Sequence, residues 1–413
     1  MSDRSLFAHR DFRMLLVGQT TSQFGAQVSG IAIPLLAVLT LNATPFELGL
    51  VTASSTVAFA VIGLPAGAWL DRWRRRPILV ASDLARTVLL GTIPLGAVLG
   101  FLTIPYLVTV SLLVGVARVF FDVGYQSYLP SVIGRHQVLA GNSVMETIRA
   151  SGQVVGPGVG GALVTLIGAA NVVLVQAVTF AVSAVSLLGI RVTEPAITAA
   201  QDAPRLFPQI VEGLRFVRHN RLLRAMAIAS GASNFSFAVA AAVSFIFLSR
   251  TLELSAAAIG LIVAAGSVTV VAGAAFTPRL SKAFGSARII WLSLTVTAPI
   301  AMIGPFAQPG WLVVLIIVGI AAGEFGQIIY AITNVSLRQR LCPDRMLGRV
   351  NATMRFLIMG LFPLGALVGG VLGEWIGLRG TLWVAGGIVV LAPLPIFLAL
   401  RGIRDVDDLP SWG

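Results

Sequence analysis

The stretch Gly152-Gln153-Val154-Val155-Gly156-Pro157-Gly158-Val159-Gly160-Gly161 places five glycines and a proline inside a long apolar segment. In a water-soluble helix each interior glycine costs about 1 kcal/mol and an interior proline about 3 kcal/mol. A membrane helix tolerates them better, because neighbouring helices satisfy the backbone groups. Small residues at positions 152, 156 and 160 form a ridge that lets another helix approach closely. The stretch therefore predicts a kinked, tightly packed transmembrane helix at a moving interface.

The composition is that of a membrane protein with many spans. The 413 residues are 56% hydrophobic and only 11% charged, and the mean hydropathy is +0.90. These values lie outside the range of soluble globular proteins. The first apolar run, residues 12–40, is too long for the core of a secretory signal. We therefore expect it to remain in the protein as the first span.

Charge and cysteine content exclude several classes of function. The formal net charge is +12, but the basic residues fall in short loops between apolar runs, which argues against a nucleic-acid partner. The single cysteine, Cys342, excludes an internal disulfide and a cysteine-based metal site. The glycines at 156, 158 and 161 match a dinucleotide fingerprint, but no strand precedes them and they lie inside a span. With no phosphate-loop pattern and no nucleophile–base–acid set, we expect no enzyme, no metal and no cofactor.

Twelve apolar segments each approach the roughly 20 residues that a bilayer requires. The predicted fold is an all-α membrane protein with twelve transmembrane helices. We therefore expect the lipid bilayer to be one of its partners. The segments cover roughly residues 13–40, 46–70, 78–99, 104–127, 142–167, 170–190, 225–249, 255–277, 287–305, 310–334, 350–376 and 379–400.

Basic residues mark one side of the membrane. They gather at the N-terminus, in the loops after spans 2, 8 and 10, in the middle segment and in the C-terminal tail, whereas the opposite loops carry only Arg250 and Arg379. Cytoplasmic loops are enriched in Lys and Arg. We therefore expect both termini in the cytoplasm of a bacterial cell, with the chain in its plasma membrane as a monomer.

The two halves of the chain echo each other. Four residues of span 5 recur in span 11 at one constant offset: Asn142, Gly156, Gly160 and Gly161 match Asn351, Gly365, Gly369 and Gly370. Two six-span halves related as parallel repeats are a transporter architecture. We predict a first half at residues 1–190, a cytoplasmic linker with an amphipathic helix at 191–224, and a second half at 225–413.

Two motifs resemble the major facilitator superfamily. The segment Gly67-Ala68-Trp69-Leu70-Asp71-Arg72-Trp73-Arg74-Arg75-Arg76 is similar to its signature between spans 2 and 3, although Arg74 stands where a glycine is usual. The stretch from 152 to 161 is similar to its antiporter motif at every fixed position, namely Gly152, Gly156, Pro157, Gly160 and Gly161. We expect these residues to pack at the seam between the two halves.

The resemblance extends over essentially the whole chain. The middle helix around residues 212–217 and the loop at 343–351 are similar to the drug, macrolide and siderophore exporter branch. This resemblance implies proton antiport, with the proton gradient as energy source and alternating access between two six-helix halves. It also implies that spans 1, 4, 7 and 10 line a central cavity.

The loop after span 2 predicts a conformational latch formed by Gly67, Asp71, Arg72 and Arg76. Asp71 can meet the positive N-terminal end of a helix in the other half. Arg72 and its neighbours can pair with Asp122 at the cytoplasmic end of span 4. The alternative is that these arginines only set the topology.

Charged residues inside spans are costly and usually functional. Glu324 stands alone in span 10 and is our first candidate for proton coupling, with a structural hydrogen bond as the alternative. Arg118 and Asp122 are spaced to pair on one face of span 4, either for coupling or as a structural pair. Glu146 and Arg149 begin span 5, and they either couple protons or form a static pair.

The four expected cavity spans also carry polar side chains that could hold a substrate. These are Gln19, Gln23, Asn234, Gln327, Tyr330 and Asn334. We expect export of small amphipathic molecules by proton antiport. Uptake or lipid flipping by the same fold is the first alternative, and a transport-dead membrane sensor or scaffold is the second.

Overall fold

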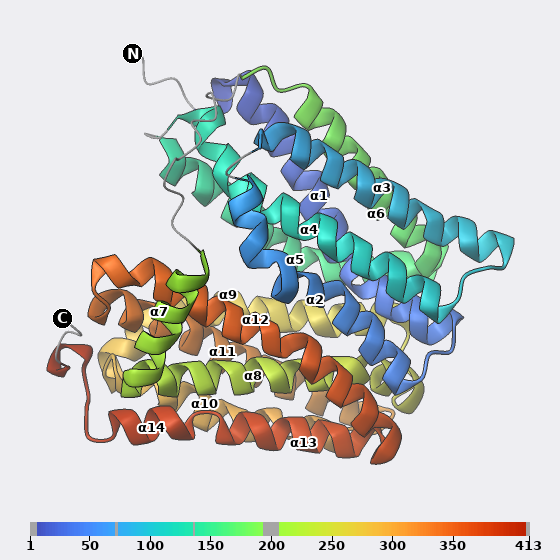
Figure 1. The fold of residues 1–413 in the computed structure, drawn as a ribbon. Coiled ribbons are helices and arrows are strands. Elements are labelled where there is room, and N and C mark those ends of the chain that lie inside the picture. The colour runs from blue at the N-terminus through green and yellow to red at the C-terminus, as the bar shows by residue number, and fades with distance from the viewer. Residues whose placement is uncertain (1–5, 71–72, 135–136, 193–205, 410–413) are drawn as a thin grey trace. The chain divides into compact units, whose positions relative to one another are not determined.

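A computed structural model describes residues 6–70, 73–134, 137–192 and 206–409. This part of the chain is built from helices (Figure 1), and twelve of them are long and apolar enough to cross a membrane. The predicted all-helical membrane fold is thereby confirmed. Asp71 and Arg72 of the predicted latch lie outside the described residues.

The chain divides into two compact units. The first comprises residues 1–201 with 254–264, and the second comprises residues 202–253 with 265–413. The first break falls inside the predicted linker. The segment Leu254–Ala264, which the sequence placed in the second half, groups instead with the first unit.

The first unit holds six long helices. They are α1 (Arg10–Leu35), α2 (Pro45–Leu70), α3 (Arg75–Leu99), α4 (Ile104–Ile133), α5 (Val138–Ile167) and α6 (Ala169–Leu188). Helix α1 packs against α5 and α6, α3 packs against α4 and α6, and α2 packs against α4.

The second unit repeats this pattern. Its helices are α8 (Arg221–Ile246), most of α9 (Ala256–Phe284), α10 (Arg288–Ala301), α11 (Val314–Leu341), α12 (Asp344–Trp375), and α13 (Gly377–Leu391) with α14 (Leu394–Leu400). Helix α8 packs against α12 and α13, and α10 packs against α11 and α13. These pairs correspond to the contacts of α1 and α3 in the first unit, as parallel repeats require.

The backbone shows the repeat even where the sequences differ. Helices α1 and α8 both end in a five-residue π-helical turn, at Leu36–Thr40 and Phe247–Thr251. Each turn is followed by a non-glycine residue with positive φ, which is 52° at Asn42 and 55° at Glu253. A positive φ is uncommon outside glycine and asparagine, so the shared bend reflects common architecture rather than residue type.

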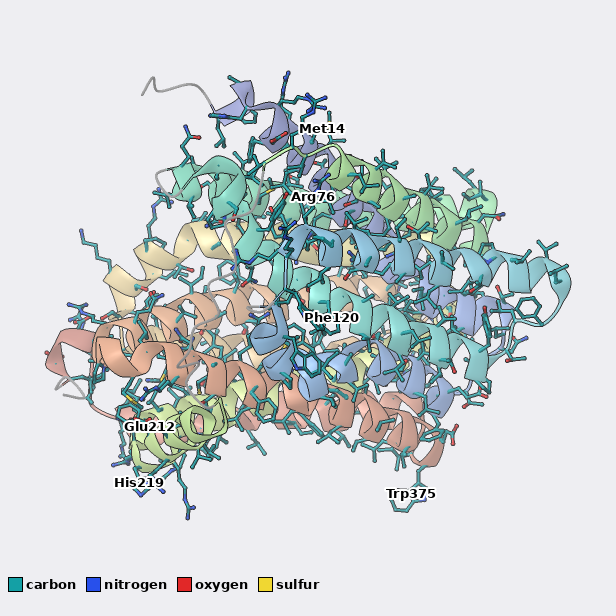
Figure 2. The ribbon with its side chains drawn as sticks, turned by 45° about the horizontal axis from the view of Figure 1, so that its top comes forward. Met14, Arg76, Phe120, Glu212, His219 and Trp375 are labelled. Carbon is teal, nitrogen blue, oxygen red and sulfur yellow. The ribbon has the colours of Figure 1, made fainter. Side chains whose placement is uncertain are left out.

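The linker contains the predicted amphipathic helix, α7 (Leu206–His219). It packs against α8 and α12 of the second unit, and Figure 2 shows Glu212 and His219 on it. Glu212 forms an ion pair with Arg349 of α12 at 2.6 Å. A side chain at Gly213 would overlap that of Thr353. The linker helix is therefore docked on the second unit.

The C-terminal tail returns to the loop between α9 and α10. The backbone N–H and hydroxyl of Ser286 donate to Asp405 Oδ1, at 2.9 and 3.2 Å. The backbone N–H groups of Ala287 and Arg288 donate to the carbonyl of Arg404, at 3.0 and 3.2 Å. The hydrogen bond from the Ser286 backbone is the main reason why the pKa of Asp405 lies below its usual value.

Candidate functional site

The glycine ridge of α5 packs against α1 of the same unit. A methyl group on Gly156 would overlap the side chain of Gln27, and one on Gly160 would lie 2.5 Å from the carbonyl oxygen of Val28. Glycines four residues apart share one helix face, and here that face meets α1. Gly156 and Gly160 therefore pack inside the first unit rather than at the predicted seam between the halves.

The matching glycines of α12 make the same contact in the second unit. A methyl group on Gly365 would lie 2.5 Å from the carbonyl oxygen of Phe235, and one on Gly369 would lie 2.7 Å from Cα of Val239. Both partners are on α8, the counterpart of α1. The sequence repeat between spans 5 and 11 thus encodes one packing contact that is made twice.

Gly161 faces a different neighbour, because it lies about 100° around the helix from Gly160. A methyl group on it would overlap the carbonyl oxygen of Ala256 and lie 2.9 Å from Cα of Gly260. Ala256 and Gly260 belong to the segment of α9 that groups with the first unit. In addition, the Thr165 hydroxyl accepts a hydrogen bond from the backbone N–H of Ala257 at 3.1 Å.

Helix α4 carries the predicted pair of Arg118 and Asp122. Arg118 Nε lies 3.4 Å from Asp122 Oδ2, and the side chains are 67% and 35% exposed. Because α4 continues to Ile133, Asp122 lies about 16 Å before the end of the helix at 1.5 Å per residue. The helix therefore continues well beyond Asp122, and the predicted pairing with Arg118 is confirmed, whereas the predicted partner Arg72 lies outside the described residues.

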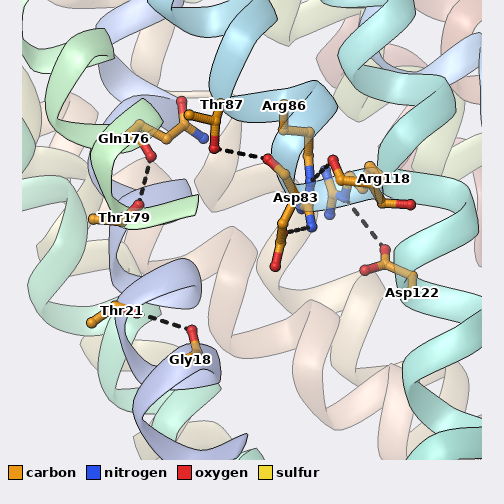
Figure 3. A network of polar contacts seen from close by, with 10 residues as sticks. Gly18, Thr21, Asp83, Arg86, Thr87, Arg118, Asp122, Gln176 and Thr179 are labelled. Atoms are coloured by element: carbon orange, nitrogen blue, oxygen red, sulfur yellow. Dashed lines mark hydrogen bonds and ion pairs between the residues drawn. The ribbon is translucent and has the colours of Figure 1, made fainter. Parts of the chain in front are cut away.

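A second ion pair, which the sequence analysis missed, lies on α3. Arg86 pairs with Asp83, and the side chains are 6% and 0% exposed (Figure 3). The Arg86 guanidinium also lies 4.3 Å from the ring centroid of Phe121 and 4.1 Å from that of Phe180. Two ionisable residues three apart inside span 3 were a visible signal, of the same kind as the pair on span 4.

Glu146 and Arg149 of α5 form a local pair at the surface of the first unit. Arg149 Nε donates to Glu146 Oε2 at 2.9 Å, and the side chains of Arg149 and Glu146 are 45% and 63% exposed. Their contact is between neighbours on one helix, three residues apart. This geometry favours the static pair over the coupling role.

Arg76 is the member of the predicted latch whose contacts the structure describes. It lies near the start of α3 (Figure 2), and its Nε and Nη2 donate to the carbonyl oxygens of Leu187 and Leu188, at 2.9 and 2.5 Å. Carbonyl groups at the end of a helix lack partners within that helix and carry partial negative charge. Arg76 therefore caps α6, and Gly67 lies within α2.

Tyr330 and Asn334, predicted to face a cavity, are buried between α11 and α8. Their exposed fractions are only 2% and 5%. Asn334 Nδ2 donates to the Tyr330 hydroxyl at 2.7 Å and to Ser230 Oγ at 3.2 Å, and the two hydroxyls lie 2.6 Å apart. Here they form a network that joins two helices, because polar atoms in an apolar interior must find partners. Their placement in a cavity lining is wrong for this structure.

The remaining predicted polar residues differ in burial. Gln19 is buried at 4% exposure, whereas Gln23 and Gln327 are half-buried. The Asn234 side-chain amide donates to the carbonyl of Ile358 at 2.6 Å. Its amide oxygen remains able to accept a hydrogen bond.

Glu324 is half-buried in α11 beside Gly266 of α9. Within the described residues it makes no hydrogen bond or ion pair. The predicted alternative, a structural hydrogen bond to a neighbouring helix, is therefore not observed here. Across the described residues, no group of three or more His, Cys, Asp or Glu is arranged to hold a metal ion.

Comparison with known proteins agrees with this architecture. The chain is 27% identical over 406 residues to the multidrug efflux pump Tap of Mycolicibacterium fortuitum, covering 95% of this chain and 96% of Tap. It is 28% identical over 416 residues to the enterobactin exporter EntS of Salmonella typhimurium, covering 98% and 96% of the two chains.

Solved transporters share the fold at low sequence identity. A bacterial homologue of the iron transporter ferroportin, in its inward-facing state, gives a TM-score of 0.75 at 17% identity and covers 94% of this chain and 98% of its own. The nucleoside transporter NupG gives 0.74 at 11% identity, covering 94% and 99%. The family model of the Major Facilitator Superfamily matches residues 15–359 and 226–411. The chain therefore belongs to the major facilitator superfamily.

Proposed function

We propose that this chain exports small amphipathic molecules in exchange for protons, by alternating access. The observation that carries the proposal is the likeness, over nearly the full length of both chains, to proteins named as a multidrug efflux pump and as an enterobactin exporter. The names of these relatives indicate different cargoes. Their likeness therefore supports outward transport rather than one particular substrate.

Proton coupling needs a carboxyl group that changes charge inside the membrane. A charge at this depth is costly without a partner, and binding a proton removes it. Glu324 has no cation partner among the described residues, and it is our first candidate. Asp122 is the second, because its ion-pair contact with Arg118, at 3.4 Å, is longer than a charge-assisted hydrogen bond.

Each unit contributes candidate substrate contacts from the polar residues that packing leaves available. These are Gln23 of α1 in the first unit, and Asn234 of α8 and Gln327 of α11 in the second, all of them half-buried. Tyr330 and Asn334 act as support for α8 and α11 rather than as ligands. We place both termini and the linker helix in the cytoplasm of a bacterial plasma membrane, since arginine-rich segments favour that side.

A drug-susceptibility screen tests the proposal. The full chain is expressed in a bacterial host that lacks its own major pumps, and growth is measured against a panel of toxic amphipathic compounds with and without a protonophore. Export driven by protons raises tolerance to some compounds, and the protonophore removes that protection. Glu324→Gln, at matched membrane abundance, should lose most of the protection.

Two outcomes would contradict the proposal. Protection that survives the protonophore would exclude proton antiport as the energy source. Increased sensitivity to the compounds would instead favour uptake by the same fold.

A further inference from the structure

The ion pair on α3 is buried inside the first unit and has no part in the function proposed above. Asp83 has no exposed side-chain surface and Arg86 has 6%. A buried pair of this kind is costly to desolvate, and replacing it with apolar residues often stabilises a protein. Its position inside a membrane span therefore points to a role beyond packing.

The surroundings of Arg86 would support its charge if Asp83 became neutral. A guanidinium stays protonated in proteins, so it needs another source of negative potential once its partner accepts a proton. Phe121 of α4 and Phe180 of α6 each present a ring to it, at 4.3 and 4.1 Å. A cation over an aromatic face is stabilised by about 2 kcal/mol or more when desolvated.

Asp83 also offers a second oxygen for that proton. Its Oδ1 is held by Arg86, whereas its Oδ2 is buried. The hydroxyl of Ser183 on α6 is near the carboxyl group, and a hydroxyl can accept the hydrogen bond that a protonated carboxyl group donates. Protonation at Oδ2 removes the negative charge while the guanidinium stays between its two rings.

Among the described residues, the charged side chains that face this pair from neighbouring helices are on α4. Helices α4 and α6 pack against α3, and α6 contains no ionisable side chain. On α4, Arg118 and Asp122 both interact electrostatically with Arg86, and Figure 3 shows the four side chains together. Because Asp122 is 35% exposed, it links the buried pair to the exposed surface of α4.

We propose that Asp83 is a proton-binding site of the first unit, with Arg86 as its fixed counter-ion. This proposal rests on the proton coupling of the proposed function. It adds the carboxyl group of Asp83 to that of Glu324 as a group that binds and releases a proton. The proton arrives from the side of Asp122 and binds Asp83 Oδ2. The ion pair is thereby weakened, and Arg86 becomes available to attract Asp122.

Infrared difference spectroscopy of the full chain in lipid nanodiscs tests the site without any substrate. Spectra at alkaline and acidic pH are subtracted, and the carbonyl stretch of protonated carboxyl groups is resolved into components. We expect one component to be lost in Asp83→Asn and to shift in Asp83→Glu. Glu47→Gln, at the start of α2, should leave that component in place.

A purely structural Asp83 gives a different result. It would stay ionised as long as the chain is folded, so Asp83→Asn would give the wild-type spectrum, which would overturn the proposal. If Asp83→Asn does not fold, Asp83→Glu provides the test. Carbonyl-stretch components at the wild-type positions in Asp83→Glu would also overturn the proposal. A second readout is the titration midpoint of the Asp83 component, which should shift in Arg118→Gln.

Transport by the same preparations separates this inference from the proposed function. If the wild type shows no proton-driven export but the Asp83 component titrates, the proposed function fails and the proton site stands. If export is proton-driven and no component depends on Asp83, only the inference fails.

Discussion

The close approach of α5 to α1 predicts that one methyl group at Gly160 weakens the first unit. In Gly160→Ala the added carbon would lie 2.5 Å from the carbonyl oxygen of Val28 and 3.1 Å from its Cα. Both atoms are backbone, so no side chain can rotate away, and α1 must shift. Overpacking of this kind costs about 1–3 kcal/mol, which corresponds to roughly a 5- to 150-fold change in the unfolding equilibrium.

The matched control is Gly91→Ala on α3, where an added methyl group meets no atom within 4 Å. Alanine is the better helix former by about 1 kcal/mol, and this control measures that gain alone. Thermal unfolding of the purified proteins should place Gly160→Ala below Gly91→Ala. Gly369→Ala should also fall below the control, because its methyl group would overlap the Val239 carbonyl oxygen. Equal midpoints for the three variants would refute the packing argument.

Three further predictions concern polar contacts. Removing the Tyr330 hydroxyl in Tyr330→Phe should cost about 1–3 kcal/mol of stability, because Asn334 and Ser230 lose a buried partner. The panel of exported compounds should stay unchanged. A changed panel would indicate that Tyr330 contacts the substrate. Arg76→Gln should lower the midpoint of thermal unfolding, because the charged cap on α6 is lost. An unchanged midpoint would indicate that Arg76 only sets the membrane topology. The lowered pKa of Asp405 stabilises the docked tail above the unfolded pKa of that carboxyl group, and the effect is lost as the pH falls through its folded value. Hydrogen exchange at the α9–α10 loop should therefore rise at acidic pH in the wild type and be high at all pH values in Asp405→Asn.

Hydrophobic segment length was enough to predict the twelve membrane-spanning helices. A bilayer admits few spanning structures, so apolar runs of about 20 residues translate directly into helices. The glycine match between spans 5 and 11 also predicted the repeat. It could not tell which helix the ridge meets, because a small-residue face packs equally well on any close neighbour.

The site was harder to predict, because burial and partners depend on how each helix is rotated. Spacing placed Arg118 and Asp122 on one face, and they do pair. Tyr330 and Asn334 were placed in a cavity by the number of their span, whereas their face of α11 turns towards α8. The spacing rule that paired Arg118 with Asp122 would also have paired Asp83 with Arg86. Their aromatic neighbours come from two other helices, so no local sequence pattern shows them.

The most direct test of proton-driven export uses inverted membrane vesicles that contain the full chain. A compound from the susceptibility screen is added outside, and a proton gradient, acidic inside, is imposed. We expect accumulation of the compound inside the vesicles, collapse of that accumulation on addition of a protonophore, and strong impairment in Glu324→Gln. Accumulation that is independent of the gradient, or none in vesicles where the chain is folded and abundant, would contradict it.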